Sequence, residues 1–314
     1  MPLLKRKRVL AAKIESTIGT AETLAGTDAA FNIYNPMIQA SIDMEAREGQ
    51  GGFGYLTSIP GARRGTATFR TYLEWDGTAT EPAWADTFLP ACGWVKSGQV
   101  YSPRSEAPGT NVKTLTIACY SDGVRKQIAG ACGTFVVTLP TGRAGYIDWT
   151  FTGVLQSAPT DVALLTPTYP TDKPLRFGGS AAEWNNGNLC VSQATINAGN
   201  QVMLRECPTS DAGYISAIIT DRRPTITLDP EAVTVASQDR WAAWLAQTEY
   251  ALELDVDSGP LTGDVLSFDA PKAQLLNIQE ADRSGFVTDA LEFVCNKNGA
   301  THDEELTITF TAGA

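Results

Sequence analysis

The 314-residue sequence contains a single histidine, His302, and this scarcity narrows the chemistry that the chain can perform. One imidazole cannot build a multi-histidine metal site. It also leaves His302 as the one residue available for histidine-based catalysis. His302 stands in the polar stretch NGATHDEE close to the C-terminus, which is typical of a solvated loop. The sequence therefore predicts neither a histidine-based active site nor a metal site.

Several motifs of common enzymes are also missing. There is no G-x-x-x-x-G-K-[ST], no G-x-S-x-G and no H-E-x-x-H, and the glycine-rich stretch at 51–61 lacks the G-x-G-x-x-G spacing. The 35 Asp and Glu residues leave a carboxylate pair of the glycosidase type open, although no pattern isolates such a pair. We predict that the protein is not an enzyme, with no catalytic residues and no cofactor.

Long apolar runs are absent as well. No stretch approaches the roughly 18 apolar residues that cross a bilayer, and the basic cluster Lys5–Arg8 precedes only four apolar residues, fewer than a signal peptide needs. The six cysteines form no C-x-x-C pair, so we expect most of them to be buried small apolar residues. These features predict a soluble protein made in a cytoplasm, without a membrane partner.

Charge is sparse and unbalanced. Charged residues make up 19% of the chain and apolar residues 43%, and 24 Lys and Arg against 35 Asp and Glu leave a net charge of −11. The apolar fraction is too high for a disordered acidic chain. The acidic balance also argues against binding nucleic acid through a broad basic surface, because that mode depends on neutralising phosphates.

What the chain does contain is alternation of period two. Residues 306–311, 225–228 and 146–151 alternate polar and apolar side chains, and 134–139 is strand-like but more apolar. Alternation of this kind places one face of a strand on a core and the other towards solvent or a partner. Frequent Gly and Pro separate the runs. The fold class is therefore predicted to be mainly β, with antiparallel sheets.

Two segments, 80–89 and 237–246, break the alternation and predict short helices. Each begins near a hydroxyl residue that could cap it and carries aromatic residues at helical spacing, which we expect to pack on a sheet. These residues are Thr80, Trp84 and Phe88 in the first segment, and Ser237, Trp241, Trp244 and Leu245 in the second.

The two helices belong to an internal repeat. Three landmarks recur at almost one offset: Arg63 and Arg222 are 159 residues apart, Trp84 and Trp241 are 157 apart, and Thr150 and Thr309 are 159 apart. A period this long indicates a tandem duplication of one β-rich module. We predict an N-terminal arm at 1–36, a first module at 37–160, a proline-rich linker at 161–174 and a second module at 175–314.

The ordered set of segments resembles bacteriophage major tail tube proteins. The stretches at 10–36, 61–74, 81–94 and 120–161 carry most of the resemblance, and it continues more weakly through 177–180, 219–227 and 306–313. The resemblance implies two tandem tail-tube-type β-sandwich or barrel modules, each with one flanking short α-helix. It also implies a structural virion protein whose rings stack into the tail tube, with an inner β-barrel through which DNA passes during ejection.

The repeat bears on symmetry. Rings in this family contain six modules, so a chain with two modules predicts a trimeric, pseudo-hexameric ring, the alternative being a ring of six chains. The resemblance further implies tape-measure, tail terminator and tail-tip proteins as partners, transient non-specific passage of double-stranded DNA, and assembly in the bacterial host cytoplasm before residence in the virion.

Three sets of residues are candidates for assembly or conduit roles. The first is a glycine-rich loop that loses much conformational entropy on ordering, and that we expect to order between rings: Gly49, Gly51, Gly52, Phe53 and Gly54. The second is a pair of arginine dyads for inter-subunit ion pairs: Arg63, Arg64, Arg222 and Arg223. The third is a set of acids for an acidic lumen that repels DNA: Asp43, Glu45, Glu48 and Glu74.

Each set also has an ordinary interpretation. The loop suits a flexible hairpin tip, the arginines suit solvated strand ends, and the acids suit an outer wall. The segment 1–36, with Lys5–Arg8, is a further candidate for contact with an acidic surface of a neighbouring chain. Two alternative functions remain open from the sequence. One is another virion structural role in a tail tip, baseplate or decoration protein, and the other is a carbohydrate-binding or glycoside hydrolase module, which the seven tryptophans would suit.

Overall fold

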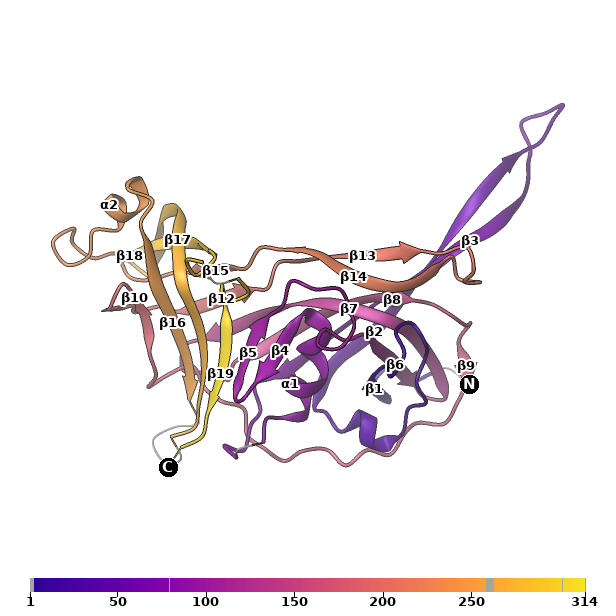
Figure 1. Cartoon of the computed structure of the whole chain (residues 1–314), viewed down its shortest axis with the longest axis horizontal. Helices are drawn as coiled ribbons and strands as arrows, with labels where there is room; N and C mark the ends of the chain where they lie inside the picture. The colour runs from indigo at the N-terminus through magenta and orange to yellow at the C-terminus, as the bar shows by residue number, and fades with distance from the viewer. Residues whose placement is uncertain (1–2, 79, 258–262, 301, 314) are drawn as a thin grey trace.

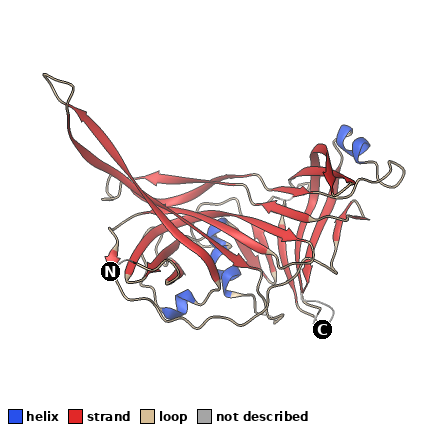
Figure 2. Cartoon of the chain, turned by 180° about the vertical axis from the view of Figure 1, so that it is seen from behind, coloured by secondary structure: helices blue, strands red, loops and turns tan. Residues whose placement is uncertain are grey.

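The fold is mainly β, as the alternation predicts. The computed structural model describes residues 3–78, 80–257, 263–300 and 302–313, and within these ranges it contains nineteen strands, two short α-helices and two 3₁₀ helices. The strands form antiparallel sheets around a common core; the first α-helix packs against the strands of the first half, and the second lies at the periphery (Figures 1 and 2). The prediction of a β-sandwich or barrel type of fold is confirmed.

The first half builds its sheet from strands that neighbour one another in the order β2–β3–β8–β7–β6–β1. A short strand, β9, pairs with the start of β7. The elements of this half are β1 (Arg8–Ile14), η1 (Gly26–Ala29), β2 (Ile33–Glu48), β3 (Tyr55–Tyr72), α1 (Ala83–Phe88), η2 (Pro90–Cys92), β4 (Trp94–Ser97), β5 (Val100–Pro103), β6 (Leu115–Ser121), β7 (Val124–Pro140), β8 (Tyr146–Val154) and β9 (Thr160–Asp161).

The second half shows the order β12–β15–β18–β17–β16–β10. Its elements are β10 (Ala182–Trp184), β11 (Gly187–Asn188), β12 (Gln193–Asn197), β13 (Asn200–Glu206), β14 (Tyr214–Arg222), β15 (Thr225–Leu228), α2 (Arg240–Leu245), β16 (Glu249–Asp257), β17 (Val265–Arg283), β18 (Phe286–Cys295) and β19 (Thr307–Thr311). In this half β12 and β13 lead out to a hairpin, and β14 and β15 lead back.

Strand by strand, the two orders correspond: β15 stands where β3 stands, β18 where β8 stands, and β17 where β7 stands. An irregularity even recurs at the same place, because the register shifts after Leu115 in β6–β7 and after Tyr250 in β16–β17. One landmark from the sequence is wrong, however. Thr150 lies on β8, whereas Thr309 lies on β19, which pairs with β17 and β5 and so occupies a different position.

The two halves share one core. β12 pairs with the end of β7, and β19 pairs with β5, so the strands of both halves are joined in one sheet. The aromatic ring of Phe310 on β19 contacts Trp75, Trp84 and Tyr101, with ring centroids 5.2 to 6.0 Å apart. Burial of these rings removes a large apolar area from water and joins the halves.

Both predicted helices form, but their ends and faces differ from the predictions. α1 begins after Pro82 and not at Thr80, and α2 is capped by Asp239, whose carboxylate accepts a hydrogen bond from the Ala242 N–H at 2.8 Å, and not by Ser237. The Trp84 and Phe88 side chains are buried as expected. The expected packing of the second helix is wrong for two side chains, because Trp241 is 53% exposed and Leu245 is 79% exposed.

The segments assigned to the arm and the linker run alongside each other. Residues 8–14 of the arm form β1, which pairs with β6 and so completes the first-half sheet. Between β9 and Pro174 the chain has no regular structure, and it contacts the arm where the Asn32 amide donates to the Pro170 carbonyl at 3.0 Å. Four of the six cysteines are buried, while Cys190 is exposed and Cys207 is half-buried.

Candidate functional site

The most prominent surface feature is the hairpin of β2 and β3, which extends beyond the body of the molecule (Figure 1). Its base, around the Ile38–Ala67 pair, packs on the core, and both of these side chains are buried. Beyond the Ser41–Arg64 pair the two strands pair with no other strand among the residues that the structure describes, because the pairing of β3 with β8 ends at Arg64. The seven residues of extended strand from Ile42 to Glu48 correspond to a projection of about 25 Å.

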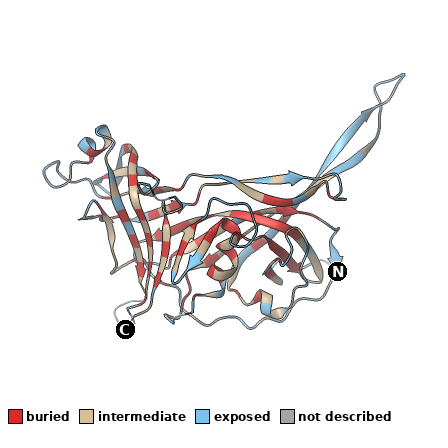
Figure 3. Cartoon of the chain, in the orientation of Figure 1, coloured by how far each residue is buried: buried red, intermediate tan, exposed pale blue. Residues whose placement is uncertain are grey.

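The projecting part of this hairpin is exposed, as Figure 3 shows, and many of its exposed side chains are apolar. A monomeric protein rarely leaves so many neighbouring large apolar side chains in water, and such patches mark interaction sites. The exposed apolar side chains of the hairpin are Ile42, Met44, Phe53, Tyr55, Leu56 and Ile59. We call this surface the hairpin patch.

The tip of the hairpin is the predicted glycine-rich loop. The Gly49 N–H donates a hydrogen bond to the Gly54 carbonyl at 3.1 Å, and Gly51 adopts a φ of +81°, which favours glycine. A Cβ atom at Gly51, Gly52 or Gly54 would meet no other atom within 4 Å. The Phe53 ring is fully exposed. No described residue lies against these three glycines, and the inter-ring role of the loop stays a prediction.

The corresponding hairpin of the second half, β13 and β14, is arranged differently. Its turn docks against β3 of the first hairpin, because the Arg63 N–H donates to the Ala212 carbonyl at 2.9 Å and the Arg63 guanidinium donates to the Asp211 carbonyl at 2.9 Å. Two further apolar side chains, Met203 and Ile215, are exposed on this hairpin. The chain thus presents one free hairpin tip and one docked tip.

Three of the four predicted lumen acids lie together on the projecting hairpin. Asp43, Glu45 and Glu48 are exposed residues of β2, and Asp43 accepts a hydrogen bond from Arg64 at 2.9 Å. Glu74 lies elsewhere and is only 7% exposed, which contradicts its assignment to a lumen surface. Its carboxylate accepts a hydrogen bond from the Asn32 amide at 2.6 Å, and burial, with the nearby charge of Asp172, raises its pKa.

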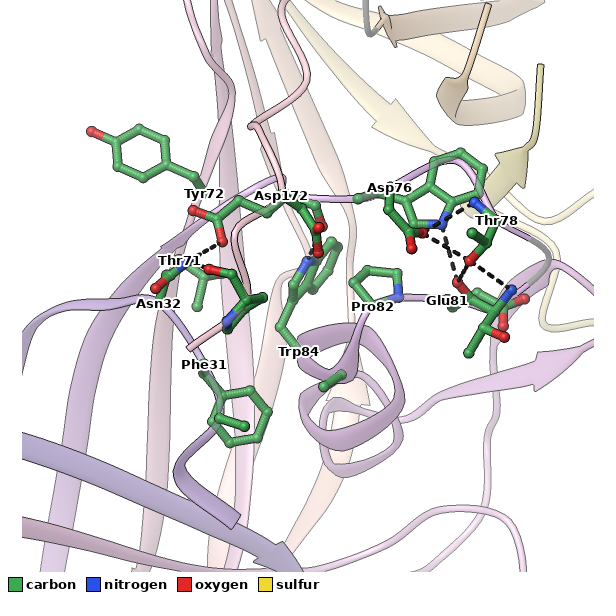
Figure 4. Close-up of a pocket in the computed structure, with 16 residues that line it drawn as sticks. Phe31, Asn32, Thr71, Tyr72, Asp76, Thr78, Glu81, Pro82, Trp84 and Asp172 are labelled. Atoms are coloured by element: carbon green, nitrogen blue, oxygen red, sulfur yellow. Dashed lines mark hydrogen bonds between the residues drawn. The ribbon is translucent and has the colours of Figure 1, made fainter. Parts of the chain in front are cut away.

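Glu74 instead belongs to a cavity of about 250 Å³ between the first helix and the segment before Pro174 (Figure 4). The Trp84 indole N–H donates to the Glu74 carbonyl at 2.9 Å, and the Trp75 indole donates to the Thr80 carbonyl at 3.2 Å. No group of three potential metal ligands occurs anywhere in the described ranges. The hydrogen bonds of this cavity fasten the helix and the extended segment to the sheet.

The paired arginines, predicted to form inter-subunit ion pairs, bond mainly within the chain. Arg222 is the clearest correction: its side chain is 8% exposed, and it donates to Glu305 at 2.6 Å and to Asp303 at 3.2 Å. Arg64 pairs with Asp43, and Arg63 holds the second hairpin. Arg223 is exposed, and its backbone N–H donates to the Gly199 carbonyl.

A row of carboxylates that sequence reasoning missed crosses three strands of the second half. Glu183 on β10 lies opposite Glu253 on β16, which lies opposite Asp269 on β17. Burial, together with the charges of Glu253 and Asp255, raises the pKa of Asp269 to about 6. Burial also raises the pKa of Glu253 and of Asp255. The alternation of 253, 255 and 257 was the only signal for this row in the sequence.

Two strand edges remain open. β2 pairs with β3 on one side only, and the last part of β17, after its pairing with β16 ends at Gln274, pairs only with β18, in both cases as far as the described residues go. An open edge presents unpaired N–H and C=O groups that can bond a strand of another chain. These edges and the hairpin patch are the surfaces through which copies of the chain can associate.

One comparison with known proteins identifies a family. A family model described as "Phage tail tube protein" matches residues 5–312, and a comparison with curated proteins finds no match. In the part of the chain that the structure covers, no helix has the length and apolarity to traverse a membrane. With nearly the whole chain matched, the protein belongs to the phage tail tube family, whose members are structural, non-enzymatic components of the virion.

Proposed function

We propose that this tail tube protein closes into rings and that the rings stack, through the hairpin patch, into the conduit for DNA ejection. The observation that carries the proposal is the bare apolar surface of the projecting hairpin. Contact with a neighbouring copy would remove these side chains from water at about 25 cal/mol per Å² of apolar area. The uncovered tip at Gly49–Gly54 orders on docking, in keeping with its glycine content.

We propose further that the chain carries one module twice, so that three chains make a pseudo-sixfold ring. The corresponding strand orders of the two halves support this reading. The halves have diverged where their surroundings differ: the first-half hairpin tip is free and the second-half tip is docked. A ring of six chains is the alternative, and counting chains in a three-dimensional reconstruction decides between them.

The acids of the projecting hairpin suit a conduit. Asp43, Glu45 and Glu48 place negative charge along β2. A wall without cations does not release the counterions of DNA phosphates, so DNA binds to it least and passes most easily. We propose that these three side chains, without Glu74, contribute to the lumen. The ends of the tube then meet tape-measure, terminator and tail-tip proteins, after assembly in the host cytoplasm.

Negative-stain electron microscopy of the purified chain tests the assembly. We expect stacked rings or tubes above a threshold protein concentration. Closed rings that never stack would favour a tail-tip, baseplate or decoration role in place of the tube. A chain that stays monomeric over the whole concentration range would overturn the proposed function.

A further inference from the structure

At the joint between the two halves of the chain, the edge of β7 pairs with a strand of the second half. The turn after β7 lies in a socket, which is formed by the segments around Phe177 and Ser192. The end of β7 pairs with β12, with Val136 opposite Asn197 and Pro140 opposite Gln193. The turn after β7 is held on both sides. The Thr141 N–H donates to the Ser192 carbonyl at 2.9 Å, and the Gly142 N–H donates to the Phe177 carbonyl at 2.6 Å. The turn therefore sits between two segments of the second half.

The second half contains an element that corresponds to β7 and the turn after it, here called the inserted element. No strand lies beside the end of this element among the described residues. β17 corresponds to β7, and the β17–β18 turn corresponds to the β7–β8 turn. Where β12 lies on β7, the corresponding edge of β17, from Asn277 to Arg283, has no strand on it among the described residues; just before it, the Leu276 carbonyl accepts a hydrogen bond from the Trp244 indole at 2.9 Å. Phe286 and Val287, directly after the turn, are exposed large apolar side chains.

The first half has its own version of the socket. β2 corresponds to β12, and β1 corresponds to β10, because Ala12 lies opposite Ile117 as Trp184 lies opposite Leu252. The segment before β1 thus corresponds to the segment before β10, which holds the turn after β7 through the Phe177 carbonyl. Between this segment and β2 lies a cavity of about 290 Å³, lined by Leu3, Leu4, Arg8, Pro36, Met37 and Lys126, among others.

We propose that this cavity and the open edge of β2 receive the β17–β18 turn and the open edge of β17 of a second copy of the chain. The contact between copies repeats the contact that β7 and β12 make within one chain. The proposal rests on the proposed function, which supplies the ring, and it names the surfaces that close the ring.

The chemistry of the two surfaces is complementary. The inserted element carries the exposed acids Glu280 and Asp282 and the apolar pair after the turn. The socket combines apolar side chains with Lys5, Arg8 and Lys126. Arg8 already donates from Nη1 to the Pro36 carbonyl at 3.1 Å, while its buried Nε has no partner among the described residues. An incoming carboxylate or carbonyl would satisfy a donor of this kind.

Geometry requires the partner to be another copy. β17 and β18 lie at one end of the molecule and the N-terminal segment lies at the other, as Figure 1 shows, so the chain cannot make this contact with itself. The contact joins two different surfaces, and such a heterologous contact produces a closed ring or an open filament according to its rotation.

The register follows from the internal joint. Thr138 lies opposite Thr195 there. In the strand registers of the two halves, Thr138 corresponds to Ala281 and Thr195 corresponds to Met37. The same pairing between copies therefore places Ala281 of one copy opposite Met37 of the next, and Gln279 opposite Gln39. Directly opposed residues of antiparallel strands have Cβ atoms about 4.5 to 5.5 Å apart, close enough for an engineered disulfide to form with little movement.

Disulfide trapping tests the register. Met37→Cys with Ala281→Cys is introduced into the full chain, with the accessible Cys190 and Cys207 changed to Ser, and assembled protein is treated with oxidised glutathione. We expect an intermolecular disulfide in most chains, seen as dimers and trimers on non-reducing gels. Thr138→Cys with Thr195→Cys is the matched positive control, because it must close within the monomer. Met37→Cys with Glu292→Cys is the negative control, because β17 and β15 flank Glu292 on both sides.

The outcomes separate this inference from the proposed function. Rings or tubes in the micrographs with no Met37→Cys–Ala281→Cys disulfide, while the positive control closes, overturn the socket and leave the tube role standing. A chain that is monomeric under all conditions overturns both. As a second measurement, Phe286→Asp changes an exposed residue, so we expect an unchanged melting temperature and a loss of ring formation of at least tenfold in threshold concentration. Unchanged ring formation would contradict the socket.

Discussion

Thr138 of β7 lies directly opposite Thr195 of β12, so one strand of the first half and one strand of the second half form a single antiparallel pair. Beside them Val137 faces Ile196, and both side chains are fully buried. The seam between the halves is therefore part of the hydrophobic core, and we expect the halves to unfold together.

Ile196→Ala tests this cooperativity. Removing three methyl or methylene groups from the seam leaves a cavity, so we expect the free energy of unfolding to fall by about 3 kcal/mol while a single transition is kept. Urea denaturation followed by both circular dichroism and tryptophan fluorescence measures it. Thr195→Ala, on the opposite face of the same strand, is the control with a smaller effect. Two separate transitions, only one of them shifted, would show that the halves are independent.

Arg222 and Arg223 are adjacent in sequence but differ in their surroundings. Arg222→Met leaves the carboxylates of Asp303 and Glu305 half-buried without their cation, and removal of one partner of a buried ion pair typically costs about 3 kcal/mol. We expect this loss in chemical denaturation. Arg223→Met, at an exposed position, is the matched control and should change stability by less than about 0.5 kcal/mol. Equal effects of the two substitutions would contradict the intrachain role of Arg222.

Asp269 should make the protein less stable as the pH rises. Its pKa is raised from 3.8 to about 6 in the folded state, so the folded chain binds more protons than the unfolded chain between these values. Stability therefore falls as the pH rises from 3.8 to about 6 and is level above that range. The groups that face Asp269 are Glu253 and Asp255 on β16 and Thr309 on β19.

The Asp269→Asn substitution removes this penalty and keeps the shape of the side chain. We expect the variant to be more stable than the parent at pH 7 by about 1–2 kcal/mol, after allowing for solvent screening, and to match it near pH 4. Asp161→Asn, at an exposed site on β9, is the control and should keep the parental pH dependence. A parental slope in Asp269→Asn would locate the penalty elsewhere.

The tip of the long hairpin can be removed without touching the core. Replacing residues 49–54 by Asn-Gly, a two-residue turn suited to antiparallel strands, should leave the melting temperature within about 2 °C, because no residue that the structure describes packs on Gly51, Gly52 or Gly54. We expect soluble protein that fails to form tubes in electron micrographs. Tubes of normal length from this variant would reject the inter-ring role of the loop.

The charge of the hairpin can be reversed separately from its shape. Glu45→Lys with Glu48→Lys should leave tube assembly intact but slow DNA ejection, because added cations bind phosphates. Ejection followed by a DNA-binding dye measures the rate. Glu45→Gln with Glu48→Gln is the control for loss of charge without reversal, and it should eject at close to the parental rate. Parental ejection from the lysine variant would place these side chains outside the lumen.

The sequence predicted the strands well where both faces of the pattern were clear. Residues 225–228 form β15, and 146–151 lie within β8, because alternation sets the buried face and hence the strand. It predicted the family on the order of its segments, and the family model confirms that prediction. Two helices were also foreseen, to within a few residues at their ends.

The errors have a common physical cause, namely that a side chain's surroundings depend on strands distant in sequence. Glu74 reads as a solvated acid, yet contacts from Asn32 and the segment before Pro174 bury it. The helical spacing predicts a buried Trp241, but its side chain is exposed. The second helix is instead anchored by the buried Arg240, which pairs with Asp289. The Thr-Phe-Thr repeat of 150 and 309 matched in letters, while strand pairing assigned the equivalent place to β18.

The pairing of β7 with β12 also has a kinetic consequence. Because both strands belong to one polypeptide, their association is a unimolecular event, with an effective concentration that dilution cannot change. Every folded chain arrives at assembly with that seam already made. Only contacts between separate chains then obey mass action, so a threshold concentration reports on those contacts alone, and dilution should open an assembly between chains while each seam stays closed.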